Sequence, residues 1–200
     1  MLDLLKITSF IDTAYPQNKG FFIYGSWAYG TNDSLSDIDI MVIEDSLDGK
    51  SEISNYDFHF LSEKEFKKDI SKLHIRALEG LFGPYSFLKF EVNVKMDNEA
   101  LREAISQKAS HSFVKAKKKI EVEKELRIGQ KSLFHSLRIL EFGIQIAQTG
   151  KIFDFTQSNH YWEEISKISD WAELNRIYKP IYNKLHTEFK LACPKPLPSA

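Results

Sequence analysis

The chain has 200 residues, of which 42% are hydrophobic and 28% charged, and its formal net charge is −1. This composition predicts one globular domain, or two small ones sharing a core, and excludes a disordered or fibrous body. The balanced charge excludes a general polycation, so any nucleic-acid contact must come from a local basic patch. The lone Cys193 excludes an internal disulfide and a multi-cysteine zinc site, and no apolar run approaches the roughly 20 residues that span a membrane. We therefore expect a cytoplasmic protein.

The first half of the chain alternates short apolar runs with polar turns. We expect a helix over 2–15, strands over 21–24, 39–43 and 54–61, a turn or short helix over 26–30, a charged turn over 44–52, and a strand or extended lead-in over 91–95. Ser62 and Glu65 have the spacing of a capping box, which predicts a helix from there to about residue 80. Residues 1–95 should therefore form an α+β core, a small mixed twisted sheet with flanking helices.

From residue 98 onward the apolar positions recur at helical spacing. Helical spacing continues almost throughout 98–149, with one helix expected over 132–149 that ends at Gly150, and another over 162–191. The remaining residues, 193–200, are rich in proline and predict a flexible tail. We therefore expect a helical domain over 96–192 after the sheet-containing core.

The stretch GSWAYGTNDSLSDIDIMVI, residues 25–43, carries the chemistry. Alternate side chains of a strand point the same way, so Asp37 and Asp39 should share one face. Two such carboxylates repel unless a cation lies between them, and their oxygens suit Mg²⁺ or Mn²⁺. Gly25 lets the backbone approach a phosphate closely, and the Ser26 hydroxyl can bind its oxygens. The alternative is a surface loop with Asp37 capping a turn, but it does not explain why Asp39 opens a buried strand.

The frame Gly25-Ser26-x10-Asp37-x-Asp39 resembles the signature of the DNA polymerase β-like nucleotidyltransferase superfamily. The resemblance implies a twisted sheet whose first strand ends at the Gly-Ser turn, an Asp pair on the second strand, and a third acid on a later strand. It also implies a reaction class, the metal-dependent transfer of a nucleoside monophosphate from an NTP, with ATP the expected substrate, onto an acceptor, with release of pyrophosphate.

The third carboxylate is best supplied by Asp57. Tyr56, Phe58 and Phe60 alternate with Asp57 and His59, so one face of this strand is apolar and the other polar. The resemblance implies that Asp57 binds the catalytic metal and can take the acceptor's proton. The alternative is that Asp57 and His59 form the solvated side of an edge strand. His59 shares the face of Asp57, although a lone histidine is usually structural or solvated.

Basic residues of the second half supply candidate triphosphate contacts. Lys131, His135 and Arg138 fall at i, i+4 and i+7 on one stripe of a helix, and Ser112 and Lys115 begin another. Magnesium neutralises only part of the charge of an NTP, so one of these faces is expected to bind its phosphates. The alternative is an ordinary solvated helix surface.

The motifs of 73–82, of 112–119 and of 131–138 are similar to those of predicted nucleotidyltransferases of the RNA-repair or RNA-ligase-associated type. This second resemblance implies an RNA end as the acceptor. Two alternatives stay open. One is a nucleotidyltransferase resembling the antitoxins that attach AMP to a partner toxin, although such proteins usually stop soon after the core. The other is a non-catalytic nucleotide- or RNA-binding module, which should lack an acid.

Overall fold

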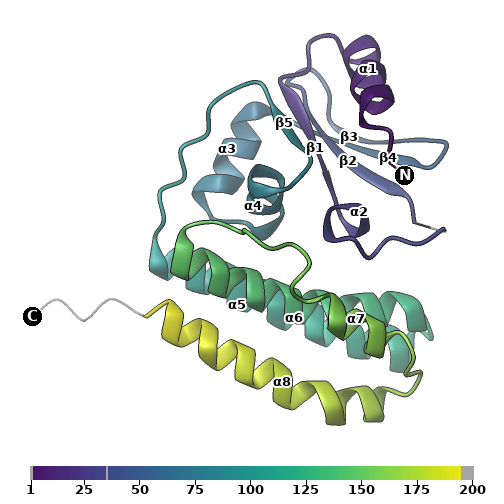
Figure 1. Cartoon of the computed structure of the whole chain (residues 1–200), viewed down its shortest axis with the longest axis vertical. Coiled ribbons are helices and arrows are strands. Elements are labelled where there is room, and N and C mark those ends of the chain that lie inside the picture. Colours follow the sequence, from purple (N-terminus) through teal and green to yellow (C-terminus); the bar gives the residue numbers. More distant parts are fainter. Residues whose placement is uncertain (1, 35, 195–200) are drawn as a thin grey trace, which may run out of the picture.

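A computed structural model describes residues 2–34 and 36–194 of the chain (Figure 1). It contains a five-stranded sheet in the order β3-β4-β2-β1-β5, made of β1 (Gly20–Tyr24), β2 (Ile38–Ile43), β3 (Gly49–Ile53), β4 (Tyr56–Leu61) and β5 (Ser86–Leu88). Strand β1 is antiparallel to β2 and β5, β3 is antiparallel to β4, and β2 and β4 run parallel. The prediction of a small mixed sheet is therefore confirmed.

Both outer strands differ from the sequence prediction. The segment expected to be a charged turn contains β3, whose sequence GKSEI is mostly exposed and has no alternating apolar signal. The segment 91–95, expected as a strand or lead-in, lies outside the sheet, and the three-residue β5 pairs with β1 instead. Edge strands bury little surface, so their apolar pattern is weak and the sequence does not reveal them.

Four helices accompany the sheet, α1 (Leu4–Ala14), α2 (Ser26–Tyr29), α3 (Glu63–Ser71) and α4 (Ile75–Phe82). The capping box at the start of α3 is present, with the Glu65 amide donating to Ser62 Oγ over 3.2 Å and the Glu65 carboxylate accepting from the Ser62 amide over 3.2 Å. The single helix predicted to residue 80 is interrupted at Leu73, whose φ is 53°. The Leu73 side chain is fully buried, and its packing offsets the cost of that left-handed backbone.

The second half is helical, as predicted, and consists of α5 (Asn98–Lys117) with a π-helical turn at Lys118–Val122, α6 (Leu126–Thr149), α7 (Asn159–Ile165) and α8 (Trp171–Ala192). The helix expected over 162–191 is divided, because Asp170 caps a new helix by accepting from the Glu173 amide over 2.8 Å. Of the flexible tail predicted over 193–200, residues 195–200 lie outside the described part of the chain.

The two faces of the sheet pack against different elements. Helix α1 covers one face through Ile7 and Ile11, which pack on Phe21, Ile40 and Phe58. The other face joins a larger apolar cluster that includes α3, α4 and the helical half, so the two halves share a continuous core. In Figure 1, α5 and α6 lie next to the sheet-containing half and α8 lies farther away. The boundary predicted between residues 95 and 96 stays a prediction. Among the described helices, none is both long and apolar enough to cross a bilayer.

Candidate active site

Two carboxylates meet where the parallel strands β2 and β4 begin. Their register places Asp39 directly beside Asp57, and Met41 beside His59. Adjacent strands lie about 4.8 Å apart and matched positions share a face, so Asp39, Asp57 and His59 project on the same side of the sheet. We call these three residues the acidic cluster. One potential ligand atom from each lies within 4.8 Å of the others.

The charges of the acidic cluster are not compensated within it. Burial raises the pKa of Asp39 to about 6, and the neighbouring charges of Asp57 and Asp37 add to that effect, while Lys131 opposes it. Burial and the charge of Lys50 lower the pKa of His59, so its imidazole is neutral near pH 7 and available as a ligand. Two carboxylates and a neutral imidazole around one point are a donor set that suits a divalent cation.

The Gly-Ser turn packs directly against this cluster. Gly25 ends β1 with a φ of 72°, a conformation that glycine adopts at little cost. A Cβ atom at this position would collide with Asp39 Oδ2. The next residue, Ser26, begins the short helix α2, whose first turn closes through hydrogen bonds from the Ala28 and Tyr29 amides to the Gly25 carbonyl. Glycine is therefore needed here both for the backbone angle and for the approach of the carboxylate.

A cleft of about 450 Å³ opens in front of Asp39, between the sheet and the helical half. Its lining brings together most of the predicted site residues, namely Gly25, Ser26, Asp39, Ser112, Lys115, Lys131, His135 and Arg138. Lys115 of α5 and Lys131 of α6 are exposed. Neither forms an ion pair within the described part of the chain, so both ammonium groups are available to an anion. Ser112 is only 5% exposed but its side chain still lines the cleft.

The two other predicted basic residues have internal partners. Arg138 is 3% exposed, and its guanidinium carbon lies 3.3 Å from the centre of the Tyr29 ring. It forms an ion pair with Glu79 at 3.8 Å and a hydrogen bond with His135 Nδ1. The Tyr29 hydroxyl donates to Glu79 Oε2 over 2.8 Å. We call Tyr29, Glu79, His135 and Arg138 the buried ion cluster; it ties α6 to α4 and α2.

Asp37 lies outside the acidic cluster. It is exposed and precedes β2, although its charge is near enough to raise the pKa of Asp39. Sequence reasoning did not assign a role to four residues that the fold brings to this region, which are His59, Arg76, Lys108 and Trp162. For His59 a signal existed, since it alternates with Asp57 on β4. The other three come from segments that only tertiary packing brings to the cleft.

A family model matches the part of the chain that contains the site. A family model described as a nucleotidyltransferase domain matches residues 4–105, just over half of the chain and the part that holds the acidic cluster. No curated protein was found to match. Among solved structures, the chain is similar to a nucleotidyltransferase-like protein from Exiguobacterium sibiricum 255-15, with 17% sequence identity and a TM-score of 0.31 over 94% of this chain and 71% of that one. Neither description mentions RNA repair, so that subgroup stays a prediction.

Proposed function

The chain belongs to the nucleotidyltransferase domain family, and from this premise we propose that it transfers a nucleoside monophosphate from an NTP to an acceptor hydroxyl. We propose ATP as the NTP. The observation that carries the proposal is the acidic cluster beside the Gly25-Ser26 turn, at the mouth of a cleft lined by three lysines, Lys108, Lys115 and Lys131, that form no ion pair within the described residues. The lone cysteine supports the cytoplasm as the proposed location.

In the proposed site, Asp39 and Asp57 would hold Mg²⁺ or Mn²⁺, His59 would add a nitrogen ligand, and Asp37 would add a carboxylate from its exposed position just ahead of β2. The cation would supply charge neutralisation at the triphosphate when bound. Ser26, Ser112, Lys115 and Lys131 bind phosphate oxygens, which orients the α-phosphorus toward the acceptor. The roles first predicted for His135 and Arg138 become indirect, because the buried ion cluster positions α2 and thereby the Gly-Ser turn.

The reaction needs a base for the acceptor. The acceptor hydroxyl oxygen forms a bond to the α-phosphorus while the bond from that phosphorus to the bridging oxygen breaks. Pyrophosphate leaves with the bonding electron pair, and the Asp57 carboxylate takes the hydroxyl proton. The resemblance of the motifs in 73–82, 112–119 and 131–138 supports an RNA end as the acceptor.

Transfer from α-labelled ATP, in the presence of Mg²⁺ or Mn²⁺ and pooled RNA, tests this proposal. Asp39→Asn should reduce labelling by about a hundredfold to a thousandfold, because the cation that would neutralise the triphosphate loses an anionic ligand. Asp48→Asn is the matched control, because Asp48 is an exposed residue between β2 and β3 whose Oδ1 accepts a hydrogen bond from the Gly49 amide. Full activity in a folded Asp39→Asn protein would overturn the assignment.

A further inference from the structure

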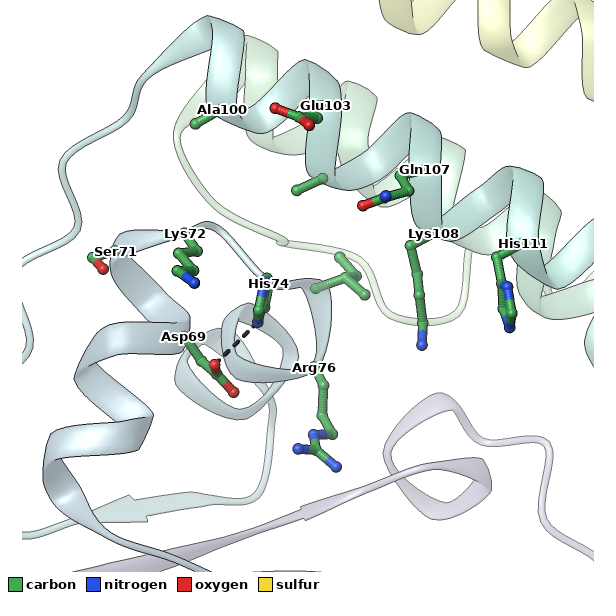
Figure 2. A pocket seen from close by; sticks show the side chains of 12 residues that line it. Asp69, Ser71, Lys72, His74, Arg76, Ala100, Glu103, Gln107, Lys108 and His111 are labelled. Atoms are coloured by element: carbon green, nitrogen blue, oxygen red, sulfur yellow. Dashed lines mark hydrogen bonds and ion pairs between the residues drawn. The ribbon is translucent and has the colours of Figure 1, made fainter.

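A second cavity of about 910 Å³ lies beside the nucleotide cleft (Figure 2). It lies between the α3–α4 segment and α5. In Figure 2, Lys72, His74 and Arg76 come from the first wall, and Gln107 and Lys108 come from α5 on the other. Its volume is in the range of pockets that bind small molecules, which is about 300–1,000 Å³. Nothing in the proposed binding of ATP uses this space.

The two cavities are continuous. Ile75, Arg76, Lys108 and His111 line both of them. On α5 the lining residues of the second cavity are 100, 103, 104, 107, 108 and 111, and those of the cleft are 108, 111, 112 and 115. Steps of three and four residues keep all of these positions on one face of the helix. The face spans about 22 Å at 1.5 Å per residue, so a single groove runs from the cleft along α5. We call the part lined by the second cavity the α5 groove.

The α5 groove has an excess of uncompensated positive charge. Lys72, Arg76 and Lys108 are exposed and form no ion pair within the described residues. The lining contains two acids. Asp69 Oδ1 lies 3.0 Å from His74 Nδ1, whereas Glu103 forms no ion pair within the described residues. Two of these cations, Arg76 and Lys108, lie nearest to the cleft, because they line both cavities.

We propose that the α5 groove is the acceptor subsite and that it takes an acceptor carrying phosphate. This inference rests on the proposed nucleotidyl transfer. When ATP fills the cleft, the acceptor hydroxyl must reach the α-phosphorus from outside the triphosphate path, and the α5 groove opens onto the cleft at Arg76. A cationic acceptor, such as an amino sugar, would meet three unpaired cations and a single unpaired acid, and is therefore disfavoured. Phosphate oxygens bind Arg76 and Lys108, with Lys72 farther out.

Two sources share this chemistry, an oligonucleotide end and a small phosphorylated sugar. The groove is long enough for a chain, and its lining contains no Phe, Tyr or Trp on which bases would stack, so a polynucleotide would be bound mainly through its backbone and without sequence preference. The two sources are separated by using a short single-stranded RNA and ribose 5-phosphate as probes in parallel titrations.

Charge reversal at Gln107 gives the sharpest test. Gln107 lines only the α5 groove and lies exposed within a helix, where Glu and Lys are both well tolerated. We expect Gln107→Glu to weaken probe binding and Gln107→Lys to strengthen it, each by roughly fivefold at low salt. The same two substitutions at Gln148, an exposed residue of α6 that lines neither cavity, are the matched controls and should have no effect.

Binding is measured by fluorescence anisotropy for labelled RNA and by calorimetry for ribose 5-phosphate, without nucleotide or metal. If the two Gln107 substitutions change the affinity for RNA in opposite directions and leave that for ribose 5-phosphate unchanged, the acceptor is a polynucleotide. If they change the affinities for both probes in this way, the acceptor is a phosphorylated small molecule. Absence of binding of either probe, or equal affinities for the Gln107 and Gln148 variants, would overturn the inference. The transfer assay is separate, so an inactive wild-type protein would overturn the proposed function while the titrations still decide the groove.

Discussion

The acidic cluster and the buried ion cluster both border the same cleft, but their charges are arranged in opposite ways. In the acidic cluster, two carboxylates lie side by side with a neutral imidazole, and burial keeps the pKa of Asp39 at about 6. In the buried ion cluster, a guanidinium lies among a carboxylate, a phenol ring and an imidazole. The first arrangement lacks a positive charge and the second contains its own.

This difference separates binding residues from structural ones. A buried charge that already has its partners contributes to the fold, whereas like charges held together lower stability until a ligand compensates them. Along α6 the contrast occurs within two turns, because Lys131 lies exposed in the cleft and Arg138 is 3% exposed with Glu79 as its partner. Substitutions in either cluster should therefore have different consequences.

The largest effect is expected from Arg138→Met. Removing the guanidinium leaves the buried Glu79 carboxylate without its cation, which should lower the free energy of unfolding by about 3–5 kcal/mol. Adding Glu79→Gln should restore part of that loss. Urea unfolding measures both. Arg127→Met is the control, since Arg127 forms an exposed ion pair with Asp33, and its loss should cost about 0–1 kcal/mol. Equal costs at the two arginines would contradict the structural role of Arg138.

In the opposite direction, Asp39→Asn should stabilise the metal-free protein at neutral pH. The pKa of Asp39 is about 6 in the folded chain against an ordinary 3.8, so the folded state binds more protons between these values. The stability of the wild-type protein therefore falls as pH rises from 4 to 6. The neutral Asn avoids that loss, so the free energy of unfolding of the variant should be higher by about 1–3 kcal/mol at pH 7. Urea unfolding in EDTA at pH 4 and pH 7 measures it. A variant less stable than wild type at pH 7 would show that Asp39 has an internal partner.

A smaller effect on ligand binding is expected from Lys131→Met. Its ammonium group is exposed in the cleft, so its removal should raise the KM for ATP by about tenfold, as for one charge-assisted contact, and leave unfolding nearly unchanged. Lys117→Met is the control, because Lys117 forms an ion pair with Glu121 at 3.8 Å and does not line the cleft. Steady-state kinetics of both variants measures these KM values. An unchanged KM for ATP in the Lys131→Met variant would show that Lys131 does not bind the nucleotide.

The smallest effect concerns acid stability. Burial and the adjacent Arg138 hold the pKa of His135 well below its ordinary value of 6.5. The unfolded chain takes up this proton as pH falls below 6.5 and the folded chain does not, so stability is lost in that range, by at most about 1.4 kcal/mol per pH unit. His135→Gln should flatten the slope of unfolding free energy against pH below 6.5. Identical slopes for the wild-type protein and the His135→Gln variant would contradict this assignment.

Much of the fold followed from the sequence, because the buried elements have clear patterns. Strands β1, β2 and β4 carry strong apolar signals, and the capping box located the start of α3. The interruption at Leu73 could not be predicted, since a leucine takes a positive φ only where its buried side chain offsets the strain. The edge strands β3 and β5 depend on pairing with neighbours and are too exposed or too short to show a pattern.

The site was predictable where it depends on neighbours in sequence. The Gly25 turn and Asp39 are joined by a local frame, and the contact between them is one that a Cβ atom would prevent. The place of His59 depends on the register between β2 and β4, and the different environments of Lys131 and Arg138 depend on what α4 presents to α6. Packing between segments far apart in the sequence determines the place of His59 and the environments of Lys131 and Arg138. The helical spacing of residues along α6 does not reveal such packing.

The proposed chemistry requires that the acidic cluster bind a divalent cation. Calorimetric titration of Mn²⁺ into the metal-free wild-type protein and the Asp39→Asn variant at pH 7.5 measures this. We expect saturable binding of Mn²⁺ to the wild-type protein and loss of that binding in the variant. Absence of binding to the wild-type protein, or equal affinity in the folded variant, would contradict the proposed chemistry.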